Sequence, residues 1–170
     1  MNFKKLLCTL LAVMSVSCAL ASCSSSDDSK TSSASSAANA NADTEAADVC
    51  ATADKLKSDI SYDDELIEFT ADKIEKILGI PADKYTSAKV YVSSSGGTPE
   101  EIACFEASDE AAAEEIKTAL ESRIESQKNT FTDYRPEQAP KLESPVLKVN
   151  GSCVYMCISG DNAKAEEIIG

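Results

Sequence analysis

The sequence predicts an α+β domain: a four-stranded antiparallel sheet made of two hairpins, each followed by a helix, with these helices packed on one face of the sheet. Three observations support this fold class. Two pairs of strand-like segments flank the turn glycines Gly96-Gly97 and Gly151. Each pair precedes a segment in which apolar residues recur at helical spacing. Two more helical segments come before the first pair, and we expect the single domain to span residues 47–170.

The first two helices are expected ahead of the sheet. Four apolar residues recur at helical spacing in the first: Val49, Ala53, Leu56 and Ile60. The second covers 71–78, and Gly79 supplies its end, since glycine commonly follows the last helical residue. The residues between these helices, 61–65, indicate a turn and a short extended piece.

The first hairpin is expected from strands over 86–93 and 101–107, because Gly96-Gly97 between them allows the positive φ angles of a tight turn. Thr98-Pro99-Glu100-Glu101 could instead begin a helix as a capping box. The short apolar run 102–105 that follows favours the strand.

The longest helix is expected after this hairpin, with Ser108 as its N-cap and an end near Thr130. Its apolar stripe recurs every four residues: Ala112, Ile116, Leu120 and Ile124. A helix of that extent is about 34 Å long, enough to lie across a small sheet.

The second hairpin is expected from 146–149 and 152–159, because Asn150-Gly151 between them is a strong signal for a tight hairpin turn. Gly160-Asp161 then opens a last helix. The order of hairpin followed by helix therefore occurs twice.

The N-terminus has the pattern of a signal peptide over 1–22: Lys4-Lys5 and then an apolar run that is too short to span a membrane. Leu20-Ala21-Ser22-Cys23 resembles the lipobox of bacterial lipoproteins, and this resemblance implies that Cys23 receives diacylglycerol and becomes the first mature residue. Two acyl chains would hold the protein stably on the extracytoplasmic face of the cell membrane. The alternative is ordinary secretion, with cleavage after Ala21.

Residues 23–46 are expected to be a disordered tether rich in Ser, Ala and Asp, because no apolar residue larger than alanine follows Cys23 there. The mature chain has 14 basic and 29 acidic residues, a net charge of −15. This charge and the lack of a basic patch argue against nucleic acid as a partner.

Histidine is absent from the sequence. Catalytic triads, Cys-His dyads and zinc sites that need imidazole are therefore excluded. The acidic run Asp63-Asp64-Glu65 lacks the spacing of a calcium loop, and we expect neither a metal nor a cofactor.

Four cysteines lie in the domain: Cys50, Cys104, Cys153 and Cys157. They are expected to be small buried residues, with a disulfide from Cys153 or Cys157 to Cys104 as the alternative.

The residues that we would examine first for a binding role are Arg123, Tyr134 and Arg135, polar groups near the end of the long helix. The alternative is surface pairing, with Phe131 and Tyr134 packed together.

From Asp63 onward the chain resembles an uncharacterised domain family of lipoproteins from Gram-positive anaerobes. The segments that carry the resemblance are Ile77-Leu78-Gly79-Ile80, Glu101-Ile102, Ala119-Leu120-Glu121-Ser122-Arg123, Tyr134-Arg135-Pro136 and Tyr155-Met156. The resemblance implies the fold and the anchor but no reaction.

We therefore expect a membrane-anchored, non-catalytic binding or interaction module whose partner is an envelope protein or a small extracellular ligand. The alternative is an envelope enzyme with a carboxylate-based site, which requires two acids that converge in a pocket.

Overall fold

The computed structural model describes residues 48–170, so the predicted signal peptide and the whole predicted tether lie outside the described residues. The described chain forms one antiparallel sheet with the strand order β1-β2-β3-β5-β4. The strands are β1 (Leu66–Glu68), β2 (Tyr85–Ser93), β3 (Glu101–Ala107), β4 (Val146–Asn150) and β5 (Cys153–Ile158). The helices are α1 (Val49–Asp59), α2 (Ala71–Leu78), α3 (Glu110–Tyr134) and α4 (Asn162–Ile169), with short 3₁₀ turns η1 (Ala82–Lys84) and η2 (Ala139–Leu142).

Both expected hairpins are present. Asn150 pairs with Cys153 across the second turn, where Gly151 has a φ of 59° that suits glycine. Gly79 ends α2 in the left-handed conformation, as expected, with a φ of 71°. The α+β class and the order of hairpin followed by helix are therefore confirmed.

The sheet has five strands, so the expected number of four is wrong. The fifth is β1, which pairs antiparallel with the end of β2 through Leu66↔Ser93 and Glu68↔Tyr91. A strand of three residues is too short to show alternation in a sequence, and it forms here because β2 offers a free edge.

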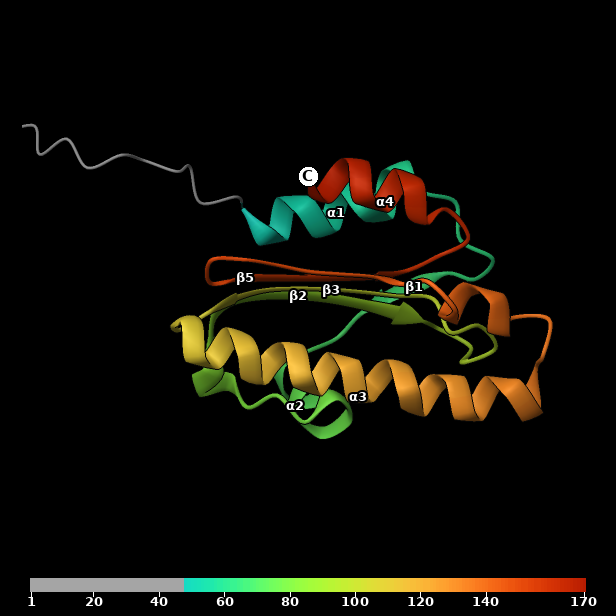
Figure 1. Ribbon diagram of the computed structural model, residues 1–170, viewed down its shortest axis with the longest axis horizontal. Helices are drawn as coiled ribbons and strands as arrows, with labels where there is room; N and C mark the ends of the chain where they lie inside the picture. Colours follow the sequence, from blue (N-terminus) through green and yellow to red (C-terminus); the bar gives the residue numbers. More distant parts are fainter. Residues whose placement is uncertain (1–47) are drawn as a thin grey trace, which may run out of the picture. The chain divides into compact units, whose positions relative to one another are not determined.

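The expectation that the helices pack on one face is also wrong, because helices cover both faces of the sheet. Figure 1 shows α1 and α4 on one face and α2 and α3 on the other. β5 is buried at every position and β3 at every position except Glu106, a pattern that belongs to strands covered on both sides.

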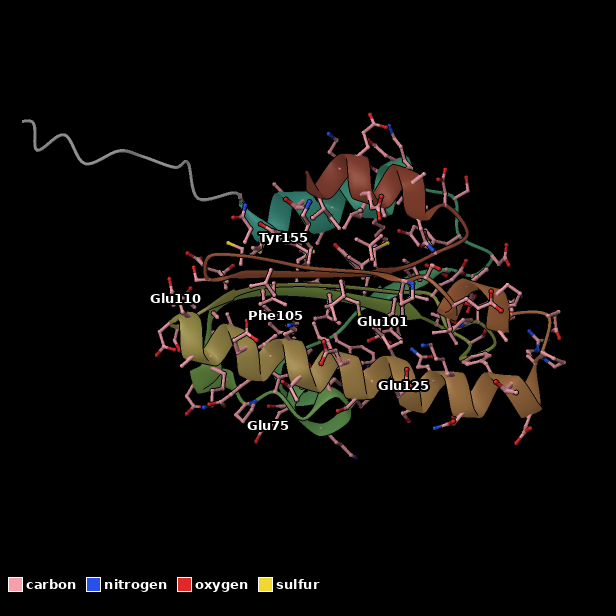
Figure 2. All side chains as sticks on the ribbon, viewed as in Figure 1. Glu75, Glu101, Phe105, Glu110, Glu125 and Tyr155 are labelled. Atoms are coloured by element: carbon pink, nitrogen blue, oxygen red, sulfur yellow. The ribbon has the colours of Figure 1, made fainter. Side chains whose placement is uncertain are left out.

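Two apolar cores result, one on each face. On the α3 side Phe105 and Met156 pack with Ile116 and Leu120, and on the α1 side Ile102 and Tyr155 pack with Leu56. Figure 2 shows Phe105 directed toward α3 and Tyr155 toward α1.

The long helix begins one residue later than expected, because Asp109 rather than Ser108 is its N-cap. The Asp109 carboxylate accepts a hydrogen bond from the Ala112 N–H at 2.8 Å. The helix continues to Tyr134, beyond the expected end near Thr130, and Figure 1 shows its last turns extending past the end of β2. None of the helices within residues 48–170 has the length and apolar character of a membrane span.

Candidate functional site

Two consecutive buried glutamates lie where β3 begins. Glu100 is 1% exposed and Glu101 is fully buried. Because adjacent residues in an extended segment point in opposite directions, the two carboxylates reach different partners.

Glu101 faces α3 (Figure 2), where Arg123 and Gln127 donate hydrogen bonds to its carboxylate. Arg123 donates to Glu101 Oε2 from Nε at 3.0 Å and from Nη2 at 2.8 Å. Gln127 Nε2 donates to the same oxygen at 2.9 Å. Burial raises the pKa of the Glu101 carboxyl, and the Arg123 guanidinium opposes this rise.

Glu100 joins three connecting segments. Its carboxylate accepts hydrogen bonds from the Asp63 N–H at 2.9 Å and from Thr98 Oγ1 at 3.0 Å. It also forms an ion pair with Lys141 of η2 at 2.7 Å. Lys141 reaches the Asp63 carboxylate as well, at 2.6 Å, so the segment before β1, the β2–β3 loop and η2 are fixed to one another.

Asp64 and Arg135 hold the conformation of the β2–β3 loop through hydrogen bonds. Asp64 accepts hydrogen bonds from the hydroxyls of Ser93 at 2.5 Å and Ser95 at 2.6 Å, which hold the pKa of the Asp64 carboxyl well below its usual range. Arg135 Nη1 donates to the Gly97 carbonyl at 2.9 Å. A Cβ at Gly97 would lie 3.0 Å from Ser95 Oγ and 3.1 Å from that nitrogen, so a side chain at this position would require both neighbours to shift by a few tenths of an ångström.

A pocket of about 190 Å³ lies between this loop and the second half of α3. It is lined by Val92, Ser93, Gly96, Thr98, Arg123, Ser126, Gln127, Thr130 and Phe131. The α3 residues among them are spaced three and four apart, which places them on one face of the helix. The pocket wall is polar and apolar in about equal parts and includes one cation, Arg123.

Arg123 lines this pocket, and part of its guanidinium is unengaged. Its Nε and Nη2 are engaged by Glu101, whereas Nη1 donates to no residue that the structure describes. The guanidinium is therefore fixed on one side and available on the other.

The three candidate residues from the sequence lie around this pocket in different roles. Arg123 lines it. Arg135 fixes the loop through Gly97, and Tyr134 is 66% exposed with its ring 6.4 Å from that of Phe131. Tyr134 and Arg135 do not line the pocket.

Sequence reasoning missed Glu101 and Gln127. A signal for Gln127 was available, because it occupies a position of the α3 stripe between Ile124 and Phe131 where an apolar residue is expected. A polar residue in such a position needs a partner, and here the partner is Glu101.

The four cysteines of the described domain are free thiols on the α1 side of the sheet. Cys104 lies opposite Tyr155, so Cys153 and Cys157 are only its diagonal neighbours. Burial raises the pKa of the Cys157 thiol to about 11 and raises that of Cys104 as well. Among residues 48–170, no group of three or more Cys, Asp or Glu side chains is placed to hold a metal ion.

The chain has no significant match among curated proteins or solved structures. A family described as a domain of unknown function, DUF4358, matches residues 58–159, which include the sheet, α2, α3 and the whole pocket. The chain belongs to this DUF4358 family.

Proposed function

We propose that this protein is a lipid-anchored, extracytoplasmic binding module that holds a small ligand in the α3 pocket and performs no reaction on it. Diacylglycerol on Cys23 would attach the chain to the membrane, and residues 24–46 would separate the domain from the bilayer. The partner is then a small molecule that reaches the outer face of the cell.

The observation that carries this proposal is the half-engaged guanidinium of Arg123. Glu101 fixes one edge of it before any ligand arrives, so little side-chain entropy is lost when the other edge binds. A polar group that is held ready in a concave site is typical of ligand recognition.

The chemistry of the pocket wall favours binding over the carboxylate-based enzyme that the sequence left as an alternative. Hydroxyls, an amide and a guanidinium line the pocket, together with Val92 and Phe131, but no carboxylate or thiol does. The buried acids Glu100 and Glu101 are engaged by separate partners instead of converging on one space. Their contacts support a role in holding the loop and Arg123 in place.

A ligand screen with matched variants tests the proposal. Residues 23–170 are produced without lipid, and a diverse set of small polar molecules is screened by NMR chemical-shift changes. We expect binders to shift the resonances of Gly96, Ser126 and Thr130.

Ser126→Phe places a ring in the pocket and should abolish binding, whereas Ser122→Phe, one helical turn earlier on the exposed face of α3, should leave it intact. A screen with no binder, or binders that Ser126→Phe does not affect, would reject the pocket as the site.

A further inference from the structure

Three of the four hydroxyl groups of the pocket residues already donate hydrogen bonds within the protein. Ser93 donates to Asp64 at 2.5 Å, Thr98 to Glu100 at 3.0 Å and Thr130 to the Ser126 carbonyl at 2.9 Å. A hydroxyl has one proton, so any hydrogen bond between these three groups and a ligand must be one that the hydroxyl oxygen accepts.

Gln127 adds a further acceptor. Its Nε2 donates to Glu101 at 2.9 Å and to the Pro99 carbonyl at 3.4 Å, which uses both amide protons. Its Oε1 accepts no hydrogen bond from any described residue, although the residue is only 6% exposed. Free side-chain donors belong to two residues of the wall, Arg123 and Ser126. Free acceptor oxygens belong to five, namely Ser93, Thr98, Ser126, Gln127 and Thr130, so acceptors are spread more widely over the wall than donors.

The wall has no net charge to attract an ion. Arg123 is its one charged residue, and Glu101 directly behind it neutralises that charge. The whole chain has a net charge of −13, which further disfavours an anion. A cation would find no carboxylate among the lining residues.

The remaining surface of the pocket, about half of the whole, is apolar. Val92 and Phe131 supply it, and the volume of about 190 Å³ is below the range of roughly 300–1,000 Å³ that is usual for drug-sized ligands. The pocket therefore suits a compact molecule that has one apolar face.

We infer that the pocket takes a neutral, polyhydroxylated molecule of about the size of one monosaccharide. This inference rests on the proposed function, since it names the ligand class of the same site. Ligand hydroxyls donate to the free acceptors, among them Gln127 Oε1, and one ligand oxygen accepts from Arg123 Nη1. The C–H face of the ligand lies against Phe131.

The test compares ligand classes on residues 23–170 by calorimetry and NMR. The panel holds neutral hexoses, pentoses and inositol, and beside them zwitterionic amino acids, carboxylates and amines of similar size. We expect at least one neutral polyol to bind with a dissociation constant in the millimolar range or lower, and to lose binding in Ser126→Phe but not in Ser122→Phe.

Thr130→Val tests the acceptor role, because it removes an oxygen and keeps the shape of the side chain. One lost hydrogen bond should weaken the binding of the polyol by about 2- to 10-fold. Asn129→Ala is the control, since Asn129 neighbours Thr130 on α3 without lining the pocket, and it should leave the affinity unchanged.

Binding of charged molecules alone at the pocket overturns the inference about the ligand class and leaves the proposed function standing. Polyol binding that survives Ser126→Phe, or that Thr130→Val does not weaken, also overturns it. If no polyol binds, the inference fails, and if the broad screen finds no binder of any class, the proposed function fails with it.

Discussion

Arg123 and Glu101 form a two-pronged ion pair across the interface between α3 and the sheet, with the carboxylate fully buried and the guanidinium side chain 23% exposed. Because of this difference in exposure, removing Arg123 and removing Glu101 should destabilise the domain by different amounts. A carboxylate without access to water depends on its partner, whereas the guanidinium can turn to solvent.

We predict that Arg123→Met destabilises the domain more than Glu101→Gln does. Arg123→Met leaves a buried acid without its counter-ion, and the loss of one partner from a buried pair typically costs about 3–5 kcal/mol. Glu101→Gln should cost about 1–3 kcal/mol, since the partly exposed Arg123 regains water. Urea unfolding of both variants measures the difference, and equal losses would contradict the asymmetry.

Asp64 is predicted to titrate below an ordinary aspartate because serine hydroxyls stabilise its charged form. The contribution of these hydrogen bonds to stability is present above the unfolded pKa of about 3.9 and is lost as the pH falls through the lower folded value. Ser95→Ala removes a donor at 2.6 Å and should move the pKa of Asp64 upward in an NMR titration.

Ser94→Ala is the matched control for Asp64, because the Ser94 hydroxyl lies 3.3 Å from the carboxylate and contributes less. If the pKa of Asp64 rose more in Ser94→Ala than in Ser95→Ala, the Ser95 hydroxyl would not be the stronger of these two donors to the carboxylate.

Cys50 is predicted to react with an alkylating reagent before the other thiols of the domain. Cys50 is half-buried, whereas Cys104 and Cys157 are fully buried. A pKa of about 11 for Cys157 lowers its thiolate fraction at neutral pH by about 100-fold relative to a thiol at 9.0. Time-resolved mass spectrometry gives the order of labelling, and labelling of Cys157 as fast as that of Cys50 would contradict the burial.

Cys23 is predicted to hold the protein on the membrane. In a bacterium that processes lipoproteins, the wild-type chain should fractionate with membranes and begin with a diacylglyceryl cysteine, and Cys23→Ser should lose both properties. Cys18→Ser is the control and should remain anchored. A wild-type product that starts at an unmodified Ser22 in the culture medium would establish ordinary secretion instead.

The parts of the fold that could be predicted from the sequence are those set by local chemistry. Asn150-Gly151 specifies its turn because the glycine reaches a positive φ without steric cost, and Gly79 ends α2 for the same reason. The backbone conformation at these two glycines is set by the local sequence and does not depend on distant residues.

The fold predictions that were wrong concern features that depend on tertiary packing. The segment 66–68 becomes a strand only because the end of β2 has a free edge. The apolar strand β5 indicated burial, but its sequence does not say which helix covers which face. The position of α4 opposite α3 follows from the path of the chain after β5.

The candidate site likewise has one part that the sequence indicated and another that depends on tertiary contacts. Arg123 was a candidate because it is a cation near the end of a long helix, but its meeting with Glu101 joins residues 22 positions apart. A glutamate at the start of a strand is ordinarily exposed, and the sequence alone does not reveal the buried pair.

A crystal structure of residues 23–170 with the tightest-binding molecule from the ligand screen would show directly whether the α3 pocket holds a ligand. We predict ligand density between the β2–β3 loop and α3, with a ligand oxygen within hydrogen-bond distance of Arg123 Nη1 and the Arg123–Glu101 pair unchanged. An empty pocket with the ligand bound elsewhere on the domain would show that the α3 pocket is not the binding site.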